Sequence, residues 1–295
     1  MKRTTLNLVL GVVVAGLAAG VFFSQKKEEK GPPLTALAAE AVTKIAVEHP
    51  GAPLIRLEKQ AGQWQLTEPV KAPADPLEVN ALVSLATTET RMTLEPKDVV
   101  AKELGLDPPQ YSVTVNDQKI EFGGVEPINY RRYLRAGGKY LLVDDPPSAA
   151  LDADYSDLVD KAPLPQGAQI EKIALPGLSI ARSADGKAWN LSPDQKDASA
   201  DARQKLVDGW RNARAMWLAA EPADSAGKGE PVTVTLKGGE QVHLVIAERE
   251  PQLVLVRPDL KVRYTLSKAL VDEILRIPVE PKDDSAKPVE PAAAK

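Results

Sequence analysis

The residues with types and spacing suited to catalysis are few, and a serine among small residues is the first to consider. Ser179 lies in the segment 177–181, Gly-Leu-Ser-Ile-Ala, which is close to a hydrolase nucleophile elbow. That elbow needs a turn from a strand into a helix, whereas the second strand of a hairpin is expected here. His49 and His243 are the only histidines available as a general base. We therefore expect no enzyme activity and no catalytic residue, with a hydrolase built on Ser179 and His243 as a less favoured alternative.

The sequence also contains few of the residue patterns that bind metal ions or nucleotides. The chain has no cysteine and two histidines, too few for the usual zinc ligand sets. No phosphate-binding loop of the Gly-x-x-x-x-Gly-Lys-Ser/Thr type is present. One acidic cluster could attract Ca²⁺, but it lacks the glycine and the final glutamate of a calcium loop, so a solvated helix face is favoured. That cluster consists of Asp152, Asp154, Asp157 and Asp160. We expect no metal and no cofactor.

One basic and aromatic stretch is a candidate for binding a partner. Residues 130–135 read Tyr-Arg-Arg-Tyr-Leu-Arg, and on a strand this spacing places Arg131, Tyr133 and Arg135 on one face. Such a face could dock an acidic partner, a glycan or a lipid headgroup. The alternative, which we favour, is the solvated charge that protects an edge strand from aggregation.

Net charge argues against nucleic acid as a partner. The chain has 37 Lys and Arg against 41 Asp and Glu, a formal charge of −4, whereas nucleic-acid binding depends largely on neutralising phosphates. The tryptophans could suggest stacking on sugars, but their positions at strand starts and on a helix stripe favour the core. They are Trp64, Trp189, Trp210 and Trp217.

An internal duplication organises the chain. The pentapeptide that begins at Val42 recurs from Ile170, and four further residues recur at a spacing of 126. These pairs are Asp75 with Asp201, Glu78 with Gln204, Glu95 with Glu221, and Pro96 with Pro222. A repeat of this kind indicates that one structural unit is present twice.

Each unit is predicted to combine hairpins with helices. Asp75 and Glu78 form a capping box at a helix start, and Asp201 with Gln204 repeats it. Closing helices are predicted over 148–159 and 267–275. Strands are predicted over 54–58 and 64–66, over 111–115, 119–122, 131–135 and 139–143, and over 232–236, 241–247, 253–257 and 262–266. The predicted fold class is α+β: one N-terminal transmembrane helix followed by two tandem duplicated repeats, each an antiparallel sheet with packed helices.

An apolar segment near the start predicts a membrane helix. Residues 6–23 are uncharged and mostly apolar behind two basic residues, and 18 helical residues reach about 27 Å. A cleaved signal peptide is the alternative, with 36–38 (Ala-Leu-Ala) as a distant cleavage site. Gly16 and Gly20 could form a helix–helix contact and thus a homodimer, although glycine is common in membrane helices. The count of Lys and Arg on the two sides does not favour a C-terminus outside the membrane, but the short basic head before the first apolar helix resembles a Sec-type signal anchor. We therefore expect a single-pass membrane protein with its C-terminal domains outside.

The predicted boundaries follow the changes in composition. Pro, Gly and charged residues mark the segments between the ordered parts, and the last segment has too few large apolar residues to fold. The prediction is a cytoplasmic head (1–5), a transmembrane helix (6–23), a tether (24–40), repeat one (41–162), a joint (163–169), repeat two (170–278) and a disordered tail (279–295).

An ordered set of turn and core residues resembles the bacterial domain of unknown function 4340 family. The resemblance covers most of repeat one, and repeat two follows a weaker version that lacks a Leu-Gly-Leu-Asp segment between Pro222 and Pro231. The matching residues are Lys44-Ile45, Leu57-Glu58-Lys59, Gly62-x-Trp64-x-Leu66-x-x-Pro69, Ala74-Asp75, Leu104-Gly105-Leu106-Asp107-x-Pro109 and Ile120-x-Phe122-Gly123. The resemblance implies a membrane-anchored protein of the bacterial envelope without an established activity and without catalytic residues to carry over. It adds to the expectation of a single-pass protein of the bacterial inner membrane, with its C-terminal domains in the periplasm.

The family resemblance also shapes the expected function. Its members are often associated with ABC-type transport systems, so we expect a non-enzymatic accessory or scaffolding subunit of a transport or envelope assembly, whose partners are envelope or transporter proteins. The alternative is a binding module for polysaccharide or another envelope ligand, which exposure of Trp64 and Trp189 would favour.

Overall fold

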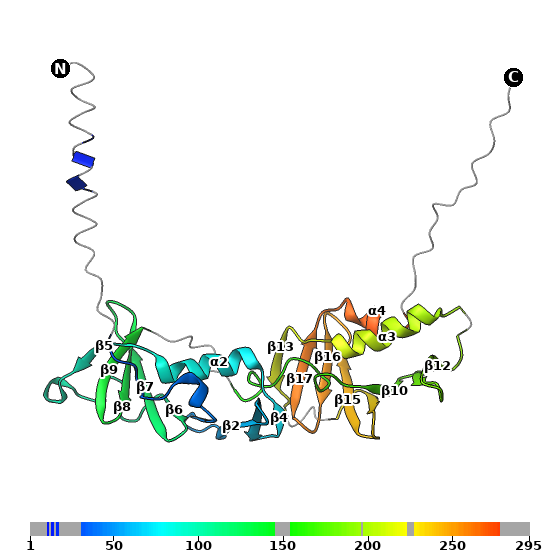
Figure 1. Cartoon of the computed structure of the whole chain (residues 1–295), viewed down its shortest axis with the longest axis horizontal. Coiled ribbons are helices and arrows are strands. Elements are labelled where there is room, and N and C mark those ends of the chain that lie inside the picture. The colour runs from blue at the N-terminus through cyan, green and yellow to red at the C-terminus, as the bar shows by residue number, and fades with distance from the viewer. Residues whose placement is uncertain are drawn as a thin grey trace, which may run out of the picture.

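The ordered part of the chain consists of two antiparallel sheets in tandem. The computed structural model describes Gly11, Val13, Val14, Gly16 and Leu17, together with residues 31–144, 154–195, 197–222 and 227–277. Figure 1 shows the two sheets following one another along the long axis of the molecule, with α2, α3 and α4 on the same long side. The predicted tail, residues 24–30 of the predicted tether and most of the predicted membrane segment lie outside the described residues.

The first sheet has nine strands in the order β4-β3-β2-β1-β6-β7-β8-β9-β5. Its strands are β1 (Lys44–Glu48), β2 (Ile55–Gln60), β3 (Gln63–Glu68), β4 (Ala72–Pro73), β5 (Thr90–Leu94), β6 (Tyr111–Val115), β7 (Gln118–Val125), β8 (Arg131–Ala136) and β9 (Lys139–Asp144). The helix α2 (Pro76–Ser84) and the short 3₁₀ turns η1 (Ala39–Ala41), η2 (Leu85–Thr87) and η3 (Pro96–Asp98) complete this part.

The second sheet has eight strands in the order β12-β11-β10-β14-β15-β16-β17-β13. Its strands are β10 (Ile170–Leu175), β11 (Leu178–Arg182), β12 (Trp189–Ser192), β13 (Trp217–Ala220), β14 (Glu230–Leu236), β15 (Gln241–Glu248), β16 (Leu253–Arg257) and β17 (Val262–Leu266), with helices α3 (Ala200–Asn212) and α4 (Leu270–Ile274). Apart from β4, the two sheets share one strand order, in which β5 and β13 occupy equivalent edges. The same topology is therefore present twice.

The predicted α+β class and its transmembrane helix are not what the structure shows. The described chain is dominated by antiparallel strands, and its three α-helices beyond residue 31 span nine, 13 and five residues. Residues 154–159 of the predicted first closing helix form turns and a bridge instead. The fold is sheet-rich because most of the apolar residues alternate along strands, which gives a period of two rather than a helical one.

The membrane prediction is corrected as well. In the part of the chain that the structure describes, no helix is long and apolar enough to cross a membrane. Within residues 6–23 only Gly11, Val13, Val14, Gly16 and Leu17 are described, and all five are helical and exposed. The expectation of a single-pass inner-membrane protein with periplasmic domains therefore has no support in this structure.

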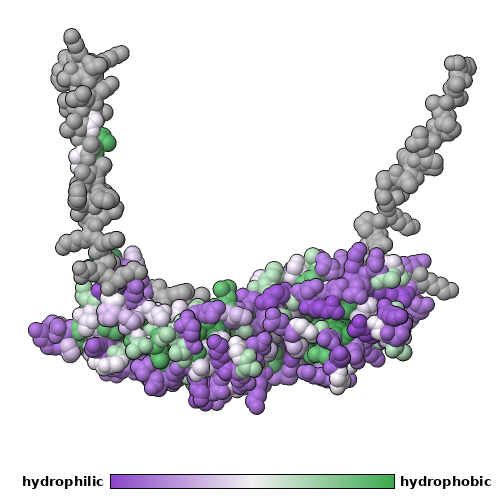
Figure 2. All heavy atoms as spheres, in the orientation of Figure 1, coloured by the Kyte–Doolittle hydropathy of each residue, from purple (hydrophilic) through white to green (hydrophobic). Residues whose placement is uncertain are grey.

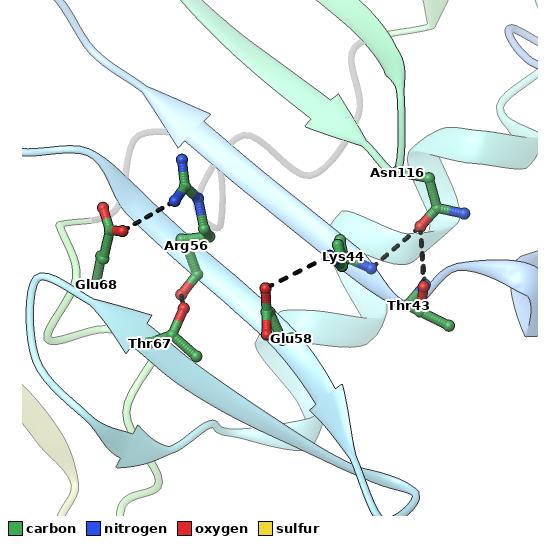
Figure 3. Close-up of polar contacts among 7 residues, drawn as sticks. All are labelled: Thr43, Lys44, Arg56, Glu58, Thr67, Glu68 and Asn116. Carbon is green, nitrogen blue, oxygen red and sulfur yellow. Dashed lines mark hydrogen bonds and ion pairs between the residues drawn. The ribbon is translucent and has the colours of Figure 1, made fainter.

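Cross-strand polar contacts hold the register of the first hairpins (Figure 3). Asn116 adopts a positive φ of 53° in the β6–β7 turn, and its side-chain oxygen accepts hydrogen bonds from the backbone amides of Thr43 at 2.9 Å and Lys44 at 3.1 Å. Arg56 on β2 pairs with Glu68 on β3 at 2.9 Å. The Asn116 bonds therefore join the start of β1 to the β6–β7 turn, and the Arg56–Glu68 pair joins β2 to β3.

The two sheets share one continuous core. It runs from Val42 in the first repeat to Leu275 in the second, while the strands and helices of each repeat pack mainly against elements of the same repeat. On the face drawn in Figure 2, hydrophobic residues form small separate areas within a mostly hydrophilic surface. The apolar side chains of both repeats are thus largely used in folding.

Residues 158–161, at the end of the predicted repeat one, form hydrogen bonds with both repeats. The Asp75 amide donates to the Leu158 carbonyl and the Asp160 amide to the Pro73 carbonyl, each at 2.9 Å. On the other side, the Ala215 amide donates to the Lys161 carbonyl at 2.8 Å. The segment 158–161 therefore bridges the β4 edge of the first sheet and the approach to β13 in the second.

Part of the predicted tether is also packed. The Gly31 amide donates to the Thr90 carbonyl at 3.0 Å, and the Leu34 amide to the Thr88 carbonyl at 2.8 Å. Residues 31–35 thus lie beside the residues that lead into β5. Lys161 lies in the equivalent place in the second repeat, beside the residues that lead into β13. The repeated unit extends further towards the N-terminus than its composition indicates.

Candidate functional site

The predicted partner-binding face lies on β8, in the interior of the first sheet. Arg131, Tyr133 and Arg135 are half-buried and alternate with buried Arg132 and Leu134, so the three residues share one face as the spacing predicts. The alternative of an edge strand is wrong, because β8 pairs with both β7 and β9. Whether this face binds a partner stays a prediction.

Both arginines of this face are neutralised by carboxylates on neighbouring strands. Arg135 donates a short hydrogen bond to Glu121 on β7, and this hydrogen bond lowers the pKa of Glu121 below its ordinary value of 4.5. Arg131 lies 3.6 Å from Asp144 on β9. A hydrogen bond from Arg91 to Asp144, at 2.5 Å, is the main cause of a lowered pKa of Asp144. The face therefore carries paired charge rather than a basic field.

A hydrogen-bonded turn adjoins this face and carries exposed apolar side chains. In the turn of residues 125–130, Ile128 is 80% and Tyr130 74% exposed. The Glu126 carboxylate accepts hydrogen bonds from the amides of Ile128 at 3.2 Å and Asn129 at 2.8 Å, and the Glu126 amide donates to the Arg131 carbonyl at 2.7 Å. The turn is held by its own hydrogen bonds, although its two largest side chains face solvent.

A second candidate is a pocket where the first repeat meets the joint segment. Its volume is about 310 Å³, and it is lined by β3, by the residues around β4 and by the joint. The side chains relevant to binding are Trp64, Gln63, Gln65, Asp160, Pro165 and Gln166. Small-ligand sites typically begin near this volume.

An arginine of the second repeat reaches the rim of this pocket. Arg214 lies 3.3 Å from the Asp160 carboxylate and 3.8 Å from that of Asp75. Asp75 is buried and caps α2 by accepting a hydrogen bond from the Leu77 amide at 2.9 Å. The junction therefore combines carboxylates of the first repeat with an arginine of the second.

The two members of the hydrolase alternative are far apart. Ser179 lies on β11 and His243 on β15, with β10 and β14 between them in the sheet. Three strand spacings separate them by about 14 Å. His243 instead lies 3.4 Å from Thr233 on the neighbouring strand. Although the sequence around Ser179 is similar to a nucleophile elbow, the structure does not bring this serine and His243 together as a nucleophile and its base.

The remaining predicted residues serve local structure or lie outside the described chain. Asp154 accepts hydrogen bonds from the amide and hydroxyl of Ser156. Burial and Asp154 raise the pKa of Asp157, whereas Asp152 lies outside the described residues, as does Gly20. Among the described residues, no group of three or more His, Cys, Asp or Glu could hold a metal ion. Gly16 is exposed in its helix, and its predicted helix–helix contact stays untested.

The tryptophans fall into two classes. Trp210 is fully buried and Trp189 is 8% exposed, as expected for core residues. Trp64 is half-buried beside the pocket, and Trp217 is 48% exposed on edge strand β13. The core prediction is therefore wrong for Trp217. It failed because α3 ends at Asn212, ahead of the last residue of the apolar stripe.

Comparison with known families gives one finding. The family model described as Domain of unknown function (DUF4340) matches residues 64–223, which is more than half of the chain and includes the β8 face and most of the residues that line the pocket. This confirms the resemblance seen in the sequence. No curated protein matches the chain, and no solved structure does.

Proposed function

Because the chain belongs to the family described as Domain of unknown function (DUF4340), which names no activity, we propose its function from its own geometry: a non-enzymatic accessory or scaffolding protein. It works by contacting another protein through the turn of residues 125–130 and the adjoining β8 face. The assembly it serves is of the ABC-type transport or envelope kind with which the family is associated.

One observation carries this proposal. Ile128 and Tyr130 are 80% and 74% exposed on a turn whose backbone is held by Glu126. Large exposed apolar side chains are the usual anchors of protein interfaces. Since the turn is already ordered, binding costs little additional conformational entropy.

The paired charges next to the turn indicate how the partner is recognised. Arg131 and Arg135 already interact with Asp144 and Glu121, so they supply little long-range attraction. The partner presents an apolar pocket for the turn, with polar groups at its rim. We expect its affinity to depend only weakly on salt.

Co-purification of variants of the full-length protein from its native cells tests this function. The double variant Ile128→Ser with Tyr130→Ser removes both anchors, while Leu77→Ser is the matched control because Leu77 is 72% exposed on α2, away from the turn. We expect a protein partner to co-purify with the wild type and with Leu77→Ser, and to be reduced at least tenfold with the double variant.

The proposal fails if the double variant retains the same partners at wild-type levels. Thermal unfolding of each variant serves as the folding control, since substitution of exposed side chains usually changes stability by less than about 0.5 kcal/mol.

A further inference from the structure

We propose that the pocket at the junction binds one ring of a neutral saccharide, stacked on Trp64. This inference goes beyond the proposed protein contacts, because it concerns a different surface and a different class of ligand. It rests on the exposure of Trp64, on the polar side chains around it and on the charge of the pocket.

The equivalent tryptophan of the second repeat shows what is unusual about Trp64. The Trp189 indole N–H donates to Gln204 of α3 at 2.9 Å, and the Arg182 guanidinium lies over its ring at 5.7 Å. Trp189 is thereby 8% exposed. Trp64 is half-buried, and its indole N–H forms no hydrogen bond with any residue that the structure describes. The first repeat thus leaves open a ring that the second repeat covers.

The side chains around Trp64 suit hydroxyl groups. Gln63, Gln65 and Gln166 line the pocket, and each amide can both donate and accept. Asp160 adds a carboxylate, one oxygen of which accepts a hydrogen bond from the Ala162 amide at 3.0 Å. A carboxylate has further acceptor capacity, so Asp160 can also accept a hydrogen bond from a ligand hydroxyl.

The charged groups and the apolar surface of the pocket indicate which class of ligand it can bind. No Lys or Arg lines the pocket within the described residues, and Arg214 at its rim is already paired with Asp160 at 3.3 Å, so no unpaired cationic group favours a phosphorylated or acidic ligand. Trp64 and Pro165 supply an apolar surface on one side. A pyranose ring combines an apolar C–H face with a rim of hydroxyls, and this matches a single aromatic ring surrounded by amides.

The pocket size sets the extent of the ligand. A volume of about 310 Å³ lies at the lower end of small-ligand sites. One sugar ring fits such a volume, and the neighbouring rings of an oligosaccharide extend into solvent. We therefore expect weak binding of each ring and tighter retention of a repetitive polysaccharide through several contacts along it.

The experiment applies the purified full-length protein to an array of neutral and acidic oligosaccharides, followed by calorimetric titration of the best neutral binder, a readout that does not depend on the tryptophan being replaced. Trp64→Ala is compared with Trp217→Ala, which removes an exposed indole elsewhere. Gln63→Ala with Gln166→Ala is a second test at exposed positions, which leaves the core untouched.

We expect wild type and Trp217→Ala to bind neutral oligosaccharides alike, and both Trp64→Ala and the double glutamine variant to bind at least tenfold more weakly. The inference is overturned if no neutral oligosaccharide is retained, or if both pocket variants bind as the wild type does. It is also overturned if the pocket binds proline-rich peptides instead, which dock on aromatic grooves. Because the protein partner is tested at Ile128 and Tyr130, either proposal can fail while the other stands.

Discussion

At the scale of single residues, the first sheet balances its charges between neighbouring strands. Glu121 and Arg135 face each other across β7 and β8 with side chains that are 20% and 33% exposed. The Arg135 hydrogen bond lowers the pKa of Glu121, so the ionised carboxylate stabilises the folded state. Opposite charges directly across a sheet are a recurrent source of modest stability.

Replacement of Glu121 by Gln tests this linkage. We expect Glu121→Gln to lower the free energy of unfolding at pH 7 by about 0.5 to 1 kcal/mol. Because the folded-state pKa is depressed, this contribution is present above the unfolded-state pKa and is lost as pH falls through the folded-state pKa. Urea unfolding from pH 7 to below pH 4 should show the two proteins converging; a constant difference would contradict the assignment.

At the scale of elements, the loop before β6 packs closely against β7. A Cβ added at Gly123 would lie 2.3 Å from the Leu104 carbonyl oxygen and 2.9 Å from Leu106, whereas one at Gly124 would lie 3.6 Å from the same oxygen. The Gly124 amide also donates to the Leu104 carbonyl at 2.8 Å. The Leu-Gly-Leu-Asp segment that carries part of the family resemblance therefore fixes this strand.

A pair of neighbouring substitutions tests that contact. We expect Gly123→Ala to lower the free energy of unfolding by about 1 to 3 kcal/mol, because the methyl group has no space without displacement of the backbone. Gly124→Ala is the matched control and should cost less than about 1 kcal/mol. Chemical denaturation measures the free energy of unfolding of both variants. Equal losses of stability would show that Gly123 is not needed for close packing against the Leu104 carbonyl.

Strand positions were largely predictable from sequence, whereas several element ends were not. The strand predicted over 111–115 coincides with β6, because alternating apolar residues and flanking turn residues define it. Edge strand β13 was missed, since its sequence Trp-Leu-Ala-Ala has no β-branched residue and continues the apolar spacing of α3. Ser199, not Asp201, caps that helix. Serine and aspartate are both good N-cap residues, so the sequence alone does not decide between the two positions.

The candidate sites were less predictable than the fold. The strand period places Arg131, Tyr133 and Arg135 on one face, but their carboxylate partners come from other strands. The pocket joins Trp64 with Asp160 and Gln166, about a hundred residues further along, and no local pattern predicts that meeting. The exposed turn was the most accessible signal missed, since Glu126 followed by Pro, Ile and Asn already indicates a capped turn.

At the scale of the whole molecule, residues 155–163 connect the two repeats by hydrogen bonds. Residues 158–161 form backbone hydrogen bonds with both sheets. The Tyr155 hydroxyl donates to the Lys261 carbonyl at 2.7 Å, and Arg257 to the Pro163 carbonyl at 2.8 Å. The buried apolar residues of the two repeats form one continuous cluster across the junction.

This architecture predicts a single cooperative unfolding transition. We expect calorimetry to give one peak whose calorimetric and van't Hoff enthalpies agree, as for a two-state domain. Trp64 and Trp210 report on the first and second repeats and should show the same midpoint in single-tryptophan variants. Two separated peaks, or different midpoints for these two probes, would mean that the repeats fold independently.

The most direct test of the proposed function is site-specific photo-crosslinking in native cells. A photo-reactive amino acid replaces Ile128 in one full-length variant and Leu77 in another, two positions of similar exposure on different surfaces. The account predicts that position 128 crosslinks to one protein partner, mapped by mass spectrometry to a defined apolar region, and that position 77 does not. Equal yields at both positions, or no protein crosslinked at position 128, would contradict a scaffolding role for this turn.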